Sequence, residues 1–256
     1  MKITLLPSSA GPSAGDLQYL TTFLIDDTIA IDAGSLGFVG TPAEQRRIQH
    51  VFLSHSHIDH VASLPIFVEN AYEGNTDPVT IHGSADVLDS LRRDLFNNRL
   101  WPDFIALSVN NPHPFLKVAR FDAGQTIEVE GLQVTAVAVD HVVPTSAFLV
   151  RDSKSSIAYV TDTGPTEEVW RHINSLPDLK AVFLEATFPN NMAWLAAISK
   201  HLTPAQFAVE AAKLTRPARL LAIHLKARFQ AQVAAELKAL NLPHFELAQF
   251  GTAYTF

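Results

Sequence analysis

Residues 55–60 read His-Ser-His-Ile-Asp-His and hold the densest group of metal-binding side chains in the chain. Because His55 and His57 are two residues apart, an extended segment would point both rings the same way, toward one metal ion. Asp59 and His60 follow at once and can turn toward a second ion. Neutral imidazole and carboxylate are the ligands that zinc takes in catalytic sites. The motif therefore predicts a metal site that can bind two ions.

Apolar runs at five places lead directly into residues that can bind a metal ion or move a proton. If the corresponding strands lie side by side, their ends place these residues along one edge of the fold, where α/β enzymes commonly build sites. The runs are 51–53 before His55, 134–139 before Asp140 and His141, 157–160 before Asp162, 182–184 before Glu185, and 220–223 before His224.

Strand patterns and helical patterns occur in both halves of the chain. Hairpins are expected where turn residues separate short apolar strands, about residues 26–27, 130–131 and 152–155. Helical patterns cover residues 84–95, with Ser84 as the cap, and residues 166–174, 203–213 and 229–240. This mixture predicts an α/β fold, an αββα sandwich in which two mixed β-sheets pack face to face with helices outside.

One domain is expected over residues 1–256, with a lid or substrate-contacting insertion at about residues 97–118. The pattern there becomes irregular, and Trp101, Phe104 and Phe115 stand among prolines and asparagines. These aromatic side chains could stack on a purine base, or they could fill a small core beneath a loop. The sequence leaves both roles open.

Composition narrows the class of protein. Hydrophobic residues make up 47% of the chain and charged residues 18%, which is typical of a folded domain. There is no cysteine, so zinc would have to be held by nitrogen and oxygen. No apolar run has the length of a membrane span. The apolar stretch at the start of the sequence is too short and too quickly interrupted for a secretory signal, so a cytoplasmic location is expected. The net charge of −7 argues against a nucleic-acid partner.

The 55–60 motif, followed by His141, Asp162 and His224, resembles the metallo-β-lactamase superfamily in order and approximate spacing. The resemblance spans nearly the whole chain and implies a site for two divalent metal ions. Zinc is the expected metal, with manganese or iron as alternatives. By that resemblance, one ion would be held by His55, His57 and His141, the other by Asp59, His60 and His224, and Asp162 would bridge the two.

Two further segments resemble the phosphodiesterase branch of that superfamily, which includes ribonuclease Z. They are Glu185-Ala186-Thr187-Phe188 and His201-Leu202-Thr203. The resemblance implies that His201 is the general acid on the leaving oxygen and that Glu185 orients it. Asp59 is counted with them as a catalytic carboxylate. Two divalent ions, two aspartates and a bridging hydroxide would leave a charge of about +1, which suits a phosphodiester.

Within the branch, the chain is most similar to the class II 3′,5′-cyclic-nucleotide phosphodiesterases. The matching stretches include 60–65, 95–98, 161–165, 199–204 and, as the more discriminating one, Trp101-Pro102-Asp103-Phe104. The resemblance implies hydrolysis of cyclic nucleotides, cAMP first, to 5′-monophosphates by a hydroxide bound between the metals. Lys200 stands where a glycine is expected, and residues 7–11 are less glycine-rich than is usual for the branch.

Three other functions remain open. A ribonuclease Z-like endonuclease that processes the 3′ end of tRNA uses the same metals and proton donor, but it needs a basic arm that the sequence does not show. A carbonyl-ester hydrolase, such as a lactonase or thioesterase, would not need Glu185 and His201. A non-catalytic protein that binds metal or nucleotide would be expected to lose ligands. The expected partner is a small cyclic nucleotide, without a membrane, and a homodimer is possible by the resemblance.

Overall fold

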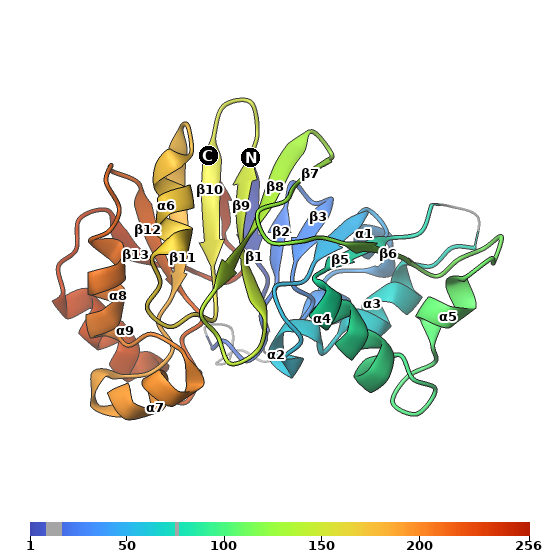
Figure 1. Ribbon diagram of the computed structural model, residues 1–256, viewed down its shortest axis with the longest axis horizontal. Helices are drawn as coiled ribbons and strands as arrows, with labels where there is room; N and C mark the ends of the chain where they lie inside the picture. The colour runs from blue at the N-terminus through green and yellow to red at the C-terminus, as the bar shows by residue number, and fades with distance from the viewer. Residues whose placement is uncertain (9–16, 75–76) are drawn as a thin grey trace. The chain divides into compact units, whose positions relative to one another are not determined.

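Two units, each built on one β-sheet, make up the chain in the computed structural model, which describes residues 1–8, 17–74 and 77–256 (Figure 1). The first unit contains residues 1–8, 20–122 and 250–255. The second contains residues 123–249, Phe256 and the described part of residues 9–19. Part of the glycine-poor stretch 7–11 lies outside the described residues.

The sheet of the first unit has seven strands in the order β14-β1-β2-β3-β4-β5-β6. Strands β14 to β3 pair antiparallel, and β3 to β6 pair parallel, so the sheet is mixed. The expected hairpin about residues 26–27 is confirmed between β2 and β3. The strands are β1 (Lys2–Leu5), β2 (Phe23–Ile25), β3 (Ile29–Ile31), β4 (His50–Phe52), β5 (Thr80–Gly83), β6 (Lys117–Arg120) and β14 (Ala253–Thr255).

The helices of the first unit are short, and several begin at side-chain caps. Ser84 caps α4 by accepting a hydrogen bond from the backbone of Val87, as expected from the sequence. The chain continues from α4 as one π-helical stretch over Leu91–Leu95. The other elements are η1 (Leu36–Phe38), α1 (Pro42–Gln45), α2 (Ile58–Val61), α3 (Leu64–Ala71), α4 (Ala85–Ser90) and α5 (Phe104–Ser108).

The expected insertion at residues 97–118 contains α5 and leads into β6. Its aromatic rings stack on one another. Phe115 lies 4.4 Å from Phe104 and 4.4 Å from Tyr72, measured between ring centroids. Trp101 packs against the core of the same unit. These contacts favour the second of the two roles left open by the sequence, an aromatic core beneath a loop.

The sheet of the second unit also has seven strands, in the order β13-β12-β11-β10-β9-β8-β7. Strands β7 to β10 pair antiparallel and β10 to β13 pair parallel. Glu130 and Gly131 turn with positive φ between β7 and β8, which confirms that hairpin. The strands are β7 (Thr126–Val129), β8 (Leu132–Val139), β9 (Thr145–Arg151), β10 (Ser156–Val160), β11 (Leu179–Glu185), β12 (Arg219–Ile223) and β13 (Phe245–Leu247).

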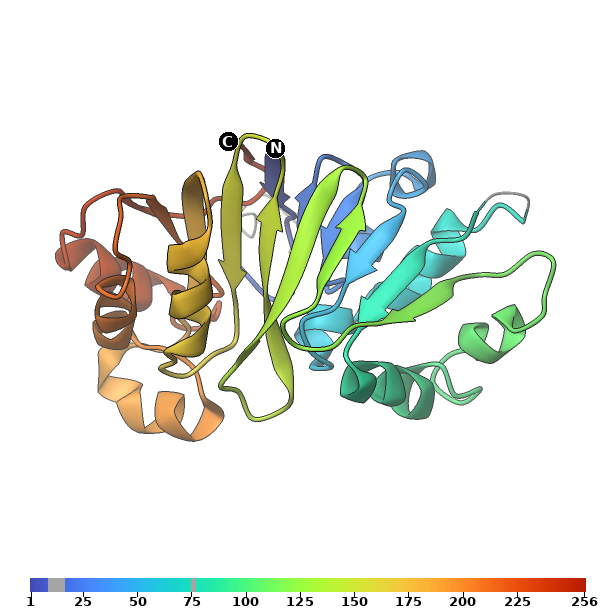
Figure 2. The same ribbon diagram turned by 45° about the horizontal axis from the view of Figure 1, so that its top comes forward.

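Helices of the second unit pack their apolar side chains against its sheet, and both views show α6 lying beside β10 (Figures 1 and 2). Thr203 begins α8 with a capping box that includes Gln206. Three of the helices match expected patterns, whereas α7 was not predicted. The elements are α6 (Glu168–Ser175), η3 (Asn190–Met192), α7 (Ala193–Ser199), α8 (Pro204–Ala211) and α9 (Gln230–Ala239).

Four of the five apolar runs belong to the second sheet and bring their ends to one edge of it. Strands β10, β11 and β12 are parallel neighbours. Strand β8 runs in the same direction because β9 is antiparallel to both β8 and β10. Strand β4 belongs to the other sheet. The sequence therefore predicted the common edge correctly for four runs and wrongly for the fifth, because β4 belongs to the sheet of the first unit.

The expected fold class is confirmed, since the chain forms two mixed sheets with helices. Among residues 1–8, 17–74 and 77–256, no helix combines the length and apolar character needed to cross a membrane.

Candidate metal centre

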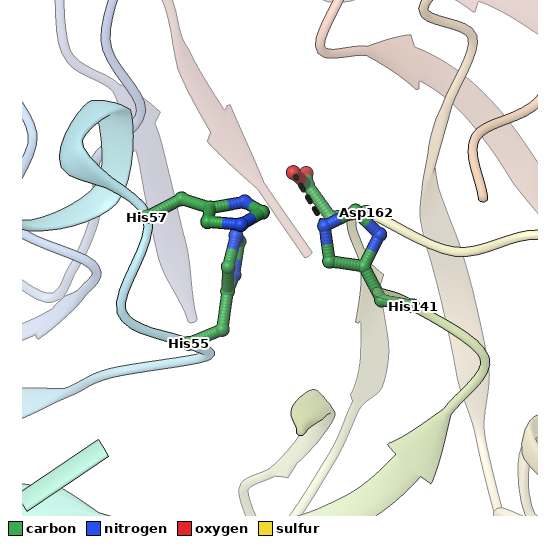
Figure 3. A group of neighbouring side chains, drawn as sticks. All are labelled: His55, His57, His141 and Asp162. Carbon is green, nitrogen blue, oxygen red and sulfur yellow. Dashed lines mark ion pairs between the residues drawn. The ribbon is translucent and has the colours of Figure 1, made fainter. Parts of the chain in front are cut away.

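The loop after β4 carries the four predicted ligands of the first unit. The rings of His55 and His57 lie near each other with centroids 4.6 Å apart (Figure 3). His57 has extended backbone and precedes the first turn of α2, which contains Asp59 and His60. Within each of the pairs His55–His57 and Asp59–His60, candidate ligand atoms lie within 4.8 Å of each other. The first unit thus brings together all four residues that the motif predicted.

Asp32, the residue directly after β3, holds this loop in place. Parallel pairing of β3 and β4 places its carboxylate beside Ser54, whose N–H donates to Oδ1 at 2.7 Å and whose Oγ donates to Oδ2 at 2.8 Å. The Nδ1 atom of His60 lies 2.7 Å from Asp32 Oδ2. All three side chains are buried. Asp32 could have been found by the same rule that found the ligands, because it too follows an apolar strand.

Three predicted ligands meet at the edge of the second sheet. Asp162 follows β10, and each of its two carboxylate oxygens faces a different histidine. Its Oδ2 lies 3.9 Å from His141 Nε2, the pair drawn in Figure 3, and its Oδ1 lies 3.4 Å from His224 Nε2. All three are buried. The Asp162 carboxylate therefore turns one oxygen toward each of two predicted histidine ligands.

Lys200 supports His141 from the end of α7. It adopts the left-handed conformation with φ of 52°, and its carbonyl oxygen lies 3.1 Å from His141 Nδ1. Its Nζ donates to Asp140 Oδ1 at 2.7 Å. The glycine expected at this position adopts that conformation without strain, so here a lysine keeps the backbone shape while its side chain is tied to Asp140.

The residues present fit divalent metal ions. The Nδ1 atoms of His60 and His141 face a carboxylate and a backbone carbonyl, which can only accept hydrogen bonds. Each ring therefore carries its proton on Nδ1 and offers the Nε2 lone pair to a metal, the arrangement that orients histidine ligands in metalloproteins. The seven predicted ligands are all imidazoles and carboxylates, a set that suits zinc, manganese or iron.

Glu185 and His201 form a buried pair beside these ligands. His201 Nδ1 lies 2.7 Å from Glu185 Oε1, and candidate ligand atoms of His201, Asp162 and His224 lie within 4.8 Å of one another. Burial raises the pKa of Glu185, but the charge and hydrogen bond of His201 outweigh it, so the pKa lies below its ordinary value. Burial lowers the pKa of His201, but Glu185 outweighs it and the pKa is raised. The arrangement favours the protonated form of the histidine.

The Glu185 carboxylate also accepts hydrogen bonds from neighbouring loops. Besides His201, it accepts hydrogen bonds from the backbone N–H groups of Thr163 at 2.9 Å and Leu202 at 3.1 Å and from the hydroxyl of Thr187 at 2.5 Å. The first contact fixes the residue after Asp162. Thr187 belongs to the Glu185-Ala186-Thr187-Phe188 segment, but the sequence alone indicates no role for it. The role of a residue of this kind depends on contacts between strands, which the order of residues does not reveal.

Comparison with known proteins identifies the family of this chain. A family model described as a β-lactamase superfamily domain matches residues 22–225. A protein of Yersinia pestis named "Probable 3′,5′-cyclic-nucleotide phosphodiesterase" is 28% identical over 66% of this chain, which spans only 52% of that protein. A ribonuclease Z of Anoxybacillus flavithermus is 23% identical, covering 77% of this chain and 75% of that protein.

Among solved structures, unliganded yeast PDE1 aligns over 98% of both chains with a TM-score of 0.78. Its sequence identity of 18% makes this a likeness of fold alone. The chain spans about half the length of the cyclic-nucleotide relatives it matches, 52% in Yersinia pestis and 48% in Dictyostelium discoideum. The family model matches most of the chain, and the two mixed sheets and the candidate metal-binding groups agree with it, so the chain belongs to the β-lactamase superfamily and has the metallo-β-lactamase fold.

Proposed function

We propose that this hydrolase is a phosphodiesterase that converts 3′,5′-cyclic nucleotides, cAMP first, to 5′-monophosphates. The observation that carries the proposal is the buried Glu185–His201 pair beside Asp162 and His224. An alkoxide leaving group needs a proton, and Glu185 raises the pKa of His201, which lies next to the predicted ligands. The names of the relatives from Yersinia pestis and Dictyostelium discoideum support the same substrate class.

The proposal includes a dinuclear centre. His55, His57 and His141 would hold one ion and Asp59, His60 and His224 the other, with Asp162 between them. Two divalent ions in such a centre would supply an activated water near neutral pH and neutralise charge on the phosphate. Zinc as the native metal, a homodimer and the cytoplasm as the location stay predictions.

The chain's own residues would then act on a proton. His201 would donate from Nε2 to the departing 3′ oxygen of the substrate, while Glu185 holds Nδ1 and stabilises the charge before transfer. Asp59 is partly exposed, so its carboxylate could also accept a hydrogen bond from the attacking water. General acids of this kind contribute about 10²–10⁴-fold to rate.

Replacement of the proton donor tests the proposal. His201→Ala in metal-loaded protein should lower kcat for cAMP by about 10²–10⁴-fold, because the 3′ oxygen must then leave without a positioned acid. The matched control is His172→Ala, since His172 pairs with Glu168 on the outer side of α6. Formation of 5′-AMP is followed by chromatography. Equal activity in His201→Ala and His172→Ala would refute the assignment of the acid.

Ribonuclease Z activity is the second candidate, because a ribonuclease Z matches more of the chain than the cyclic-nucleotide relatives do. The net charge of −7 disfavours it, since tRNA is bound through basic surfaces. A gel assay with precursor tRNA separates the two. Specific cleavage at the 3′ end by metal-loaded protein, without cAMP turnover, would replace the first proposal by the second.

A further inference from the structure

The hydroxyl of Thr187 lies between the proton-donor pair and a predicted metal ligand. Its Oγ1 is 2.5 Å from Glu185 Oε2 and 2.9 Å from His224 Nδ1. It is also 3.1 Å from the carbonyl oxygen of His224. Thr187 and His224 are both buried, so these contacts are made without competition from bulk water.

Counting protons decides which group donates in each contact. Glu185 receives two backbone N–H groups, from Thr163 and Leu202, together with His201 Nδ1, so its oxygens act as acceptors. A hydroxyl has one proton, and the short contact to a carboxylate is the strongest place for it. The Thr187 proton therefore points to Glu185, and its oxygen is left to accept.

The same count fixes the proton on His224. With the hydroxyl proton directed to Glu185, His224 Nδ1 must donate to Thr187 Oγ1, because two lone pairs at 2.9 Å would repel each other. The ring then carries its proton on Nδ1. Its Nε2 keeps a lone pair, and this is the atom that lies 3.4 Å from Asp162 Oδ1.

We propose that Thr187 is a positioning residue that fixes His224 in the Nδ1–H tautomer and so presents Nε2 as a metal ligand. The Glu185 carboxylate thus positions two histidines: it contacts the proton donor His201 directly and reaches the ligand His224 through Thr187. The inference rests on the metal centre of the proposed function, but it does not depend on which ester the enzyme hydrolyses.

Metal affinity tests the role of the hydroxyl. Thr187→Val keeps the shape of the side chain and removes its hydroxyl, whereas Thr187→Ser keeps the hydroxyl. Zinc affinity, measured by competition with a chromogenic chelator, should fall 10–100-fold in Thr187→Val for the ion that His224 would hold, as for other residues that orient metal ligands. The zinc affinity of Thr187→Ser should stay within about threefold of that of the parent, because serine keeps the hydroxyl that contacts Glu185 and His224.

Ser156→Ala is the matched control for loss of a buried hydroxyl. Ser156 Oγ donates to the carbonyl of Pro177 at 2.6 Å, at the start of β10 and away from the ligand edge. This variant should lose thermal stability and keep zinc affinity. If Thr187→Val and Ser156→Ala bind zinc equally well, Thr187 has only a structural role and the inference fails.

The tautomer itself can be read without any change of sequence at Thr187. Long-range ¹H–¹⁵N spectra of metal-free protein, labelled on histidine and assigned with His224→Gln, should show His224 protonated on Nδ1. Protonation on Nε2 would overturn the inference. Failure to hydrolyse cAMP with zinc bound would instead refute the proposed function and leave the role of Thr187 standing.

Discussion

Glu185 contacts both the proton donor His201 and the positioning residue Thr187. It is fully buried and accepts from two backbone N–H groups, one histidine and one hydroxyl. A carboxylate can satisfy all four donors, whereas a carboxamide has a single acceptor oxygen and brings donors of its own. The charge of Glu185 is therefore required by its surroundings as well as by His201.

Glu185→Gln should accordingly affect both stability and rate. Each buried donor left without an acceptor costs about 1–3 kcal/mol, so the free energy of unfolding should fall by at least that amount. The kcat should fall as well, because His201 loses the charge that holds its proton. Urea denaturation of the metal-free protein measures the first effect, with Glu168→Gln, an exposed carboxylate on α6, as control. A stability equal to that of the control would contradict this account of Glu185.

At the scale of single residues, spacing indicated candidate ligands but not the residues that contact them from other strands and loops. The order of residues within 55–60 shows which side chains can reach one ion, because those neighbours are close in the chain. Asp32 and Thr187 act across neighbouring strands or loops, so their roles appear only once β3 pairs with β4 and the loop after β11 approaches His224. Asp32 nonetheless follows an apolar strand, and that signal was present.

At the scale of elements, parallel pairing of β10, β11 and β12 gathers the groups that follow these strands. The apolar runs predicted those strands because they are buried along their length. Helix α7 escaped prediction because Trp194 and Ile198 are exposed, so its apolar residues do not form a single buried face. The left-handed residue that ends α7 matters most for the site, since it sets the carbonyl that holds His141.

Two substitutions at Lys200 separate the backbone conformation from the side chain. Both remove the exposed ion pair with Asp140, which is worth at most about 1 kcal/mol. Glycine relieves the left-handed strain and alanine does not, so Lys200→Gly should be more stable than Lys200→Ala by about 1 kcal/mol. Urea denaturation of the two variants gives the difference directly. If Lys200→Ala equals or exceeds Lys200→Gly in stability, strain at this position is not a factor.

At the scale of the whole molecule, the alternation of strands and helices predicted the α/β class and the two mixed sheets, and the structure and the family match confirm them. Boundaries were less well predicted: the helical pattern over residues 203–213 corresponds to α8 at Pro204–Ala211, because helix ends depend on caps and neighbouring elements. The substrate is a property of the site and not of the fold, so it remains the part that needs measurement.

The most direct measurement is cAMP turnover by the purified protein before and after metal removal. Protein treated with chelator should form no 5′-AMP, and addition of zinc or manganese should restore turnover, because water activation depends on the bound ions. Metal content is measured on the same samples, so that loss of activity is matched to loss of metal. Metal-dependent appearance of 5′-AMP is the predicted result. Protein with two ions bound per chain that leaves both cAMP and cGMP unchanged would contradict the proposed function.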